Sequence, residues 1–175
     1  MEVIGKHKRG RELIASVLDT VRDPSDYVRR TACEVIEQWK LVEAHDLVRP
    51  LLAEPAASMR ESALRALAKI WTDADFQLVF EIYKEDPEIG VRREAAWTLR
   101  QNPHADNWQV LFDALCVDAL PRHRTWACEL AEAFGGPKIL PALSSFADDC
   151  DGHVRKAAAR ARQMVIGRGL SRPAN

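Results

Sequence analysis

Apolar residues recur along the chain at the three- and four-residue spacing of an α-helix, and the alternation typical of strands is scarce. Pro24, Pro55 and Pro87 each stand where one apolar segment ends and the next begins, and Gly135-Gly136 ends another. The pattern therefore predicts an all-α chain of ten helices. Their approximate bounds are 10–22, 25–39, 43–53, 56–71, 74–85, 88–101, 106–117, 121–134, 138–147 and 152–166.

An internal repeat runs through the second, fourth, sixth, eighth and tenth of these helices. Each copy has an acid, an arginine six residues later and an alanine three residues after that, and successive arginines lie 31 or 32 residues apart. The acids are Asp23, Glu54, Asp86, Asp118 and Asp149; the arginines are Arg29, Arg60, Arg92, Arg124 and Arg155; the alanines are Ala32, Ala63, Ala95, Ala127 and Ala158. The repeat predicts five helical hairpins stacked as an α-solenoid.

The three repeated residues have a structural explanation. The acid falls in the turn between the two helices of a hairpin, and the arginine falls in the first turn of the second helix. Successive copies then stack as a ladder of charged residues, which fixes the orientation of the repeats more than it adds net stability. We therefore assign these five acids and five arginines to a structural ladder, and the alanines to the close approach of the two helices.

The repeated segments resemble HEAT repeats, whose second helix begins D-x-x-x-x-V-R-x-x-A. The pattern stands at Asp23…Val28-Arg29…Ala32 and, with the same spacing, from Glu54, Asp86 and Asp149. Signatures of tetratricopeptide and ankyrin repeats are absent. The short period is similar to the bacterial HEAT-like subtype named after phycobilin lyases. The resemblance covers about residues 10–166 and implies the fold, but it says little about function.

The repeat also sets the expected domain organisation. We expect one HEAT-like domain over residues 9–167, preceded by a short segment, 1–8, and followed by a mobile basic tail, 168–175. The five repeats would occupy approximately 9–40, 41–72, 73–103, 104–135 and 136–167.

Composition and charge narrow the choice of partner. The chain has 25 Lys and Arg against 26 Asp and Glu, so nucleic acid is an unlikely partner. Residues 13–150 hold 15 basic and 23 acidic side chains, whereas 151–175 hold six basic and one acidic. An acidic body of this kind suits a protein partner with a basic face. Without a long apolar run, a leader peptide pattern or a dense cysteine framework, we expect a cytoplasmic protein, monomeric and independent of membranes.

The sequence contains no group of reactive side chains at the spacing of a known catalytic or metal site. Cys33 and Cys128 follow the ladder arginine by four residues, where other repeats hold alanine or leucine, so we interpret them as small core residues. Cys116, His123 and Cys128 lack the spacing of a zinc site, and the acidic run before Gly152 lacks that of a calcium loop. Phosphate-binding loops and nucleophile elbows are also missing. We expect no enzyme activity, no metal and no cofactor.

Helical geometry selects one candidate binding surface. Counted from the ladder arginine, positions +1, +5 and +8 point away from the buried stripe, toward the concave face formed by the second helices. Trp97 stands at the centre of this face, and tryptophan and arginine are the residue types that anchor interfaces. The predicted patch consists of Arg65, Arg93, Trp97, Arg100, Trp126 and Glu129. The alternative is that both tryptophans pack into the core between repeats.

These observations favour a non-enzymatic protein-binding module, such as an adaptor, a scaffold or an inhibitor, that holds its partner on the concave face. Two alternatives come from the family resemblance. One is a phycobilin-lyase-like protein that handles a tetrapyrrole, which only the repeat subtype supports. The other is a relative of HEAT-like DNA glycosylases, although those enzymes need a strongly basic concave surface. The basic C-terminal tail could instead contact a phosphate backbone.

Overall fold

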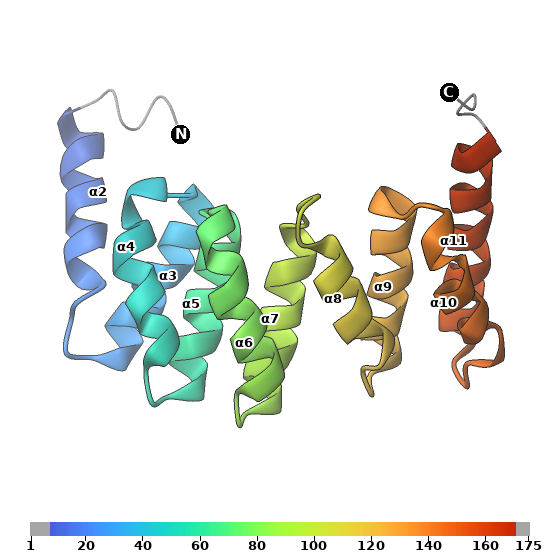
Figure 1. The fold of residues 1–175 in the computed structure, drawn as a ribbon. Coiled ribbons are helices and arrows are strands. Elements are labelled where there is room, and N and C mark those ends of the chain that lie inside the picture. The colour runs from blue at the N-terminus through green and yellow to red at the C-terminus, as the bar shows by residue number, and fades with distance from the viewer. Residues whose placement is uncertain (1–7, 171–175) are drawn as a thin grey trace. The chain divides into compact units, whose positions relative to one another are not determined.

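The computed structural model describes residues 8–170, with side chains from Glu12 to Gly169 (Figure 1). This part of the chain forms ten α-helices, α2 to α11, joined by short 3₁₀-helices and turns. The helices pair into hairpins, so the predicted all-α solenoid fold is confirmed. The chain divides into two compact units between Asn102 and Pro103, and each unit is described by itself.

The first unit holds three hairpins. The first hairpin consists of α2 (Lys8–Thr20) and α3 (Asp26–Trp39). The second runs through η1 (Val42–Ala44), α4 (His45–Val48) and η2 (Arg49–Ala53) into α5 (Ala57–Lys69). The third consists of η3 (Asp73–Asp75), α6 (Phe76–Glu85) and α7 (Ile89–Gln101). The second helices pack side by side, α3 on α5 and α5 on α7.

The second unit holds two hairpins. One consists of α8 (Trp108–Cys116) and α9 (Pro121–Phe134). The other runs through η4 (Pro137–Ile139), α10 (Leu140–Ser145) and η5 (Phe146–Asp148) into α11 (Gly152–Leu170). Here α9 packs on α11, so that the second helices are again neighbours.

Two of the expected first helices are interrupted. The segments expected as helices over 43–53 and 138–147 each consist of a short α-helix between two 3₁₀-helices. Pro50 begins the interruption in the first segment, because proline has no N–H to donate to the carbonyl four residues earlier. In the second segment, Pro141 stands in the first turn of α10, where proline is tolerated.

The repeated alanine lies in the core of every hairpin. All five of these alanines are buried, with at most 3% of their surface exposed. A side chain this small lets the two helices of a hairpin approach closely, and larger apolar residues fill the space around it. The largest fully buried side chains include Ile36, Met59, Leu64, Leu67, Leu99, Leu111, Phe112 and Leu143.

The ends of the described region differ from the expected boundaries. Helix α11 continues to Leu170, and the Arg168 guanidinium donates hydrogen bonds of 2.9 and 3.0 Å to the carbonyls of Ala133 and Ala131. The first residues of the expected C-terminal tail are therefore helical. The rest of that tail and the N-terminal segment, residues 171–175 and 1–7, lie outside the described residues. Between these limits, no helix is both long and apolar enough to cross a membrane.

Candidate protein-binding surface

The predicted binding residues of the first unit come from two neighbouring helices. Arg65 lies on α5, and Arg93, Trp97 and Arg100 lie on α7. None of the four belongs to the stripe of buried residues on its helix. We call this surface of α5 and α7 the second-helix face. Arg93 is exposed, while the other three residues are partly buried. The structure thus presents all four of them, at least in part, to solvent.

Arg65 joins the two helices of the second-helix face. Its Nη2 donates to the Ser62 hydroxyl at 3.0 Å, and its Nη1 lies 3.8 Å from a carboxylate oxygen of Glu94 on α7. Burial raises the pKa of Glu94, Arg65 opposes this shift, and the nearby carboxylates of Glu37 and Glu61 add to it. With 37% of its side chain exposed, Arg65 can still contact a partner.

Trp97 and Arg100 form a pair one helical turn apart on α7. The Arg100 guanidinium carbon lies 5.1 Å from the centroid of the Trp97 ring, within the range of a cation–π interaction. Contacts at this distance contribute about 0.5–1 kcal/mol at partly exposed sites. The pair is therefore held in place before any partner arrives, which lowers the entropy lost on binding.

Trp126 and Glu129 belong to α9, in the second unit. Trp126 is only 6% exposed, and its ring stacks on His123 with the centroids 4.8 Å apart. The Arg122 guanidinium carbon lies 5.4 Å from the centroid of the same ring. This finding corrects the expectation of an exposed tryptophan at the margin of the patch, because Trp126 is a core side chain. Glu129 is partly buried.

The ladder arginines hold the turns of their own hairpins. In each repeat the Nη1 of the arginine donates to two backbone carbonyls, those of the repeated acid and of the residue after it. The distances are 2.5–2.9 Å to the carbonyl of the acid and 2.8–3.2 Å to the carbonyl of the residue after it. These carbonyls lie in the turn between two helices, outside the backbone hydrogen-bond pattern of either helix, and the arginine supplies their donor.

Three of these arginines, Arg29, Arg60 and Arg124, also reach the acid of the next repeat. Arg60 donates through Nε and Nη2 to both carboxylate oxygens of Asp86, at 2.8 and 2.9 Å. Arg124 holds Asp149 in the same bidentate way, at 2.7 and 2.9 Å. The contact from Arg29 to Glu54 is longer, at 3.4 Å. A guanidinium plane suits such two-point recognition of a carboxylate.

The ladder contacts shift the pKa values of the carboxyl groups. Hydrogen bonds from Arg124 are the main cause that lowers the pKa of Asp149 to about 2. Burial acts to raise the pKa of Asp86, but hydrogen bonds from Arg60 and from the Glu88 backbone outweigh it, so that this pKa is lowered. Both acids are consequently ionised near neutral pH, as the ladder requires.

Three of the four cysteines and His123 are buried or partly buried, and Cys150 is exposed. Burial raises the pKa of the Cys33, Cys116 and Cys128 thiols to about 12, so these cysteines are poor nucleophiles. The His123 ring lies 2.9 Å from an Asp118 carboxylate oxygen and is buried. Within the described residues, His, Cys, Asp and Glu side chains do not gather in any group of three or more that could hold a metal ion.

A polar cluster between the second and third hairpins was not predicted. Asp75 is completely buried, and it accepts hydrogen bonds from the backbone N–H and the hydroxyl of Thr72, at 2.9 and 3.0 Å. Its carboxylate also lies 2.8 Å from Nε2 of His45 and 3.3 Å from Nε of Arg49. The T-x-x-D spacing, which is that of a helix-capping box, is the one sequence signal for it.

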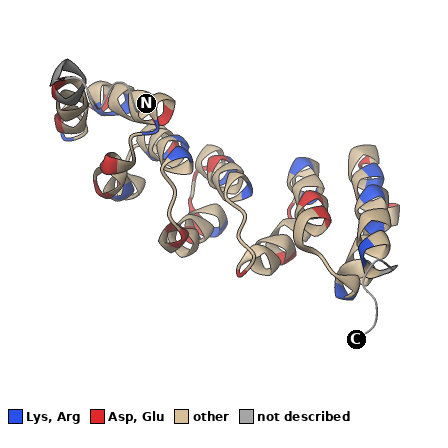
Figure 2. Cartoon of the chain, turned by 90° about the horizontal axis from the view of Figure 1, so that it is seen from above, with Lys and Arg blue, Asp and Glu red and all other residues tan. Residues whose placement is uncertain are grey.

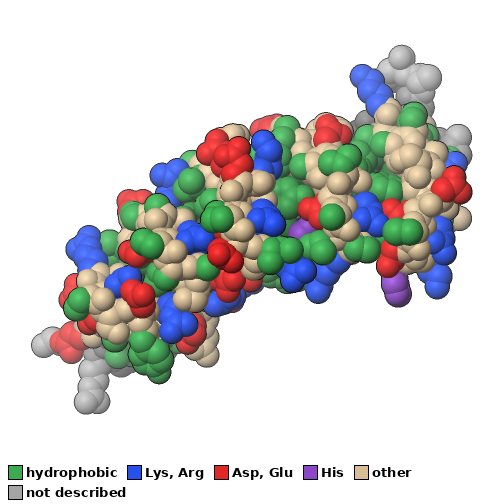
Figure 3. Space-filling model, turned by 90° about the horizontal axis from the view of Figure 1, so that it is seen from below, with side chains coloured by type: hydrophobic (Ala, Val, Ile, Leu, Met, Phe, Trp, Pro, Cys, Tyr) green, Lys and Arg blue, Asp and Glu red, His purple; other side chains and the backbone are tan. Residues whose placement is uncertain are grey.

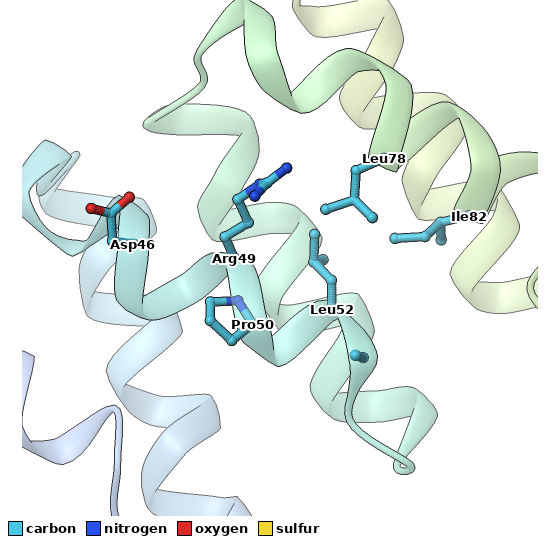
Figure 4. A pocket seen from close by; sticks show the side chains of 7 residues that line it. Asp46, Arg49, Pro50, Leu52, Leu78 and Ile82 are labelled. Atoms are coloured by element: carbon cyan, nitrogen blue, oxygen red, sulfur yellow. The ribbon is translucent and has the colours of Figure 1, made fainter.

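An open pocket lies beside this cluster, on the first helices. Its volume is about 360 Å³, and Leu52 comes from η2 while Leu78 and Ile82 come from α6 (Figure 4). Arg49 and Asp46 border the apolar lining, and the figure shows the Arg49 side chain extending toward Leu78. The neighbouring acid and base offset one another, so the pocket has no marked preference for a charged ligand.

Charges of both signs are mixed over the molecular surface. Figure 3 shows one face on which Lys, Arg, Asp and Glu alternate with small apolar areas. Figure 2 shows one exception, because α11 carries Lys and Arg along its length. A partner site must therefore be sought in particular side chains rather than in one large patch.

Comparison with known protein families identifies the repeat. The profile for HEAT repeats matches residues 14–100 and, again, residues 76–162. The chain belongs to the HEAT-repeat family. The predicted HEAT-like recognition is thereby confirmed, and HEAT repeats generally serve as protein-interaction scaffolds. A search of curated proteins found no match to this HEAT-repeat sequence. Its place in the phycobilin-lyase subtype, its cytoplasmic location and its partner stay predictions.

Proposed function

We propose that this HEAT-repeat protein is a non-enzymatic binding module that holds a partner protein on the second-helix face. The observation that carries the proposal is the Trp97–Arg100 pair, which presents an ordered aromatic and cationic surface on α7. Arg93 stands exposed one turn before Trp97, and Arg65 extends the surface onto α5. Tryptophan and arginine dominate the binding energy of many protein interfaces.

The charges of the second-helix face indicate which groups a partner would need. Arg65 has one carboxylate near it, that of Glu94, whereas the exposed Arg93 has no ion pair with any described residue. A partner segment that places an apolar side chain against Trp97 and a carboxylate beside Arg93 would make favourable contacts with both residues. Trp126 is not part of the proposed contact, because it is buried, and Glu129 lies in the other unit.

Affinity capture with matched variants tests the proposal. Wild-type protein is compared with Trp97→Ala and with Arg93→Glu, using lysate from the native cells. We expect one retained protein to be lost or reduced at least about tenfold in both variants, since such anchors contribute 2 kcal/mol or more. The control is Val117→Ala, which truncates a side chain that is 85% exposed on the second unit.

Stability measurements separate binding from folding. Arg93 is exposed, so Arg93→Glu should change the free energy of unfolding by less than about 0.5 kcal/mol. Retention of the same proteins by wild type and by both variants would contradict the proposal. A bilin absorbance band or nucleic acid in the captured material would instead support one of the two alternatives, tetrapyrrole handling or DNA repair.

A further inference from the structure

The charged ladder is open at its C-terminal end. Arg155 donates through Nη1 to the carbonyls of Asp149 and Cys150, as the other ladder arginines do in their turns. Its Nε and Nη2 make no hydrogen bond to any described residue, although the same two atoms of Arg60 and Arg124 hold a carboxylate. Arg155 is exposed and thus offers an unused two-point site for a carboxylate.

The rest of α11 shows that this end is a stacking surface. Positions +4 and +7 after the ladder arginine face the following repeat, and in α9 these positions are the buried Cys128 and Ala131. In α11 the corresponding residues, Ala159 and Arg162, are exposed, and Ile166, one turn further, is 46% exposed. We call the surface formed by Arg155, Ala159, Arg162 and Ile166 the C-terminal face.

The first repeat has the complementary surface. Position +2 is about 200° around the helix from position +4 and therefore faces the preceding repeat. Of the five residues at this position, Ser62, Trp126 and Ala157 are buried and Glu94 is partly buried, whereas Thr31 of α3 is exposed. One turn to either side, Tyr27 is 70% exposed and Glu34 is exposed.

The carboxylate of the first ladder acid, Asp23, accepts fewer hydrogen bonds than those of Asp86 and Asp149. Asp23 accepts a hydrogen bond from the Ser25 backbone N–H at 2.8 Å, and Asp86 and Asp149 accept the equivalent bonds in their turns. The carboxylates of those two acids also accept from an arginine of the preceding repeat, whereas the Asp23 carboxylate receives no bond from any arginine side chain among the described residues. We call the surface formed by Asp23, Tyr27, Thr31 and Glu34 the N-terminal face.

We propose that copies of this chain associate head to tail, with the C-terminal face of one copy on the N-terminal face of the next. The Arg155 guanidinium holds the Asp23 carboxylate of the other copy and so continues the ladder across the interface. In the register of the other repeats, Ala159 faces Thr31, Arg162 faces Glu34, and Tyr27 lies beside Arg155. The two faces carry opposite charges, and each has one large exposed apolar side chain, Ile166 on one and Tyr27 on the other. This association uses neither Trp97 nor Arg93, and it is an alternative to the expected monomer.

The interface has the properties of a weak and reversible contact. Its two faces differ, so the association is heterologous and can continue from copy to copy. Arg162 replaces the apolar residue that other repeats have at +7, so apolar burial is limited and charge pairs contribute much of the specificity. Exposed charge pairs are screened by salt, so association should be strongest at low ionic strength.

Sedimentation velocity over a range of concentrations at low salt tests the proposal. Wild-type protein should show an average mass that rises with concentration. Arg155→Asp and Asp23→Arg should each weaken association about tenfold or more, because each places like charges opposite one another. The double variant carrying both changes should recover association close to that of wild type. Arg93→Asp, which reverses a charge on the second-helix face, is the matched control and should behave as wild type.

A second pair guards against misfolding at the ladder turn. Arg162→Glu and Glu34→Arg change exposed side chains without ladder contacts, and they should show the same loss singly and the same recovery together. Circular dichroism checks that each variant is folded. A wild-type protein that stays at monomer mass at all concentrations would overturn the proposal. So would single variants that associate as wild type does, or two double variants that both fail to recover association.

Discussion

At the residue scale, the ladder arginine performs two tasks that other side chains cannot combine. Nη1 of Arg60 satisfies two turn carbonyls, of Glu54 and Pro55, while Nε and Nη2 hold the Asp86 carboxylate of the next repeat. The planar guanidinium aims its donors in these directions at once, whereas a lysine ammonium is a single point of charge. The same residue therefore fixes the turn of one hairpin and its position against the next.

Replacement of Arg60 by lysine tests this double role. Arg60→Lys keeps the charge but cannot make all four hydrogen bonds, so we expect the free energy of unfolding to fall by about 2–3 kcal/mol. Urea denaturation followed by circular dichroism measures the change. Arg93→Lys, at an exposed position, is the control and should stay within about 0.5 kcal/mol of wild type. An equally small loss in Arg60→Lys would mean that charge alone suffices.

The ladder is predictable from the sequence because its residues recur at a fixed spacing, but spacing does not reveal which atoms meet. The carbonyl contacts of Nη1 carry no sequence signal, since any residue supplies a carbonyl. The environment of Trp126 was mispredicted for a related reason. Helical geometry places it at the margin of a face, but burial at such a margin depends on the surrounding side chains, here His123 and Arg122.

At the scale of the elements, one histidine adds a titratable contact to the junction between the second and third hairpins. His45 begins α4, and its ring lies between the exposed Asp46 and the buried Asp75 of η3. Burial acts to lower the pKa of His45, but the hydrogen bonds to Asp75 and Asp46 outweigh it, and the pKa is raised. The protonated ring therefore connects the two hairpins more strongly than the neutral ring does.

This junction predicts a pH dependence of stability. Because the folded-state pKa of His45 is raised, its contribution is complete below the unfolded value of about 6.5 and is lost as pH rises through the folded value. The difference in unfolding free energy between wild type and His45→Gln should therefore shrink as pH rises from about 5.5 to about 8.5. Its total change should be on the order of 1 kcal/mol. His153→Gln is the control, and a difference that does not vary with pH would contradict the prediction.

The elements themselves were largely predictable. Most predicted helix bounds lie within two residues of the observed ones, because proline and paired glycine mark the ends in this sequence. The interrupted segments around Pro50 and Pro141 were missed because their apolar spacing is compatible with both α- and 3₁₀-helix. The cap formed by Thr72 and Asp75 was missed because it is one short pattern among many of its kind.

At the scale of the whole molecule, the division into two units has no counterpart in the repeat. Arg92 and Arg124 lie on either side of the division at Asn102–Pro103, and they are 32 residues apart, the same spacing as Arg60 and Arg92. The repeat period therefore continues unchanged across the division, and the spacing of the arginines does not mark its position. Repeat proteins are stabilised mainly by contacts between neighbours, so a unit with several complete hairpins can fold by itself.

The first unit should consequently be stable in isolation. A fragment of residues 1–102 keeps the contacts of α3 with α5 and of α5 with α7, so we expect it to be helical and to unfold cooperatively in urea. A fragment of residues 1–72 is the control, because it leaves Arg60 without Asp86 and removes the helix that packs on α5. It should be markedly less stable. A longer fragment that is no more stable than the shorter one would contradict the prediction.

The bidentate contact between one repeat and the next also bears on how such a protein can change its length through evolution. Arg29, Arg60 and Arg124 each meet an acid 25 or 26 residues further along the chain, and every repeat supplies both residues. Deleting residues 41–72 in frame would bring Asp86 to the place that Glu54 occupies, opposite Arg29. Duplication of the same segment would likewise give every new arginine a carboxylate. Gain or loss of a whole repeat by recombination therefore needs no compensating substitution in the ladder.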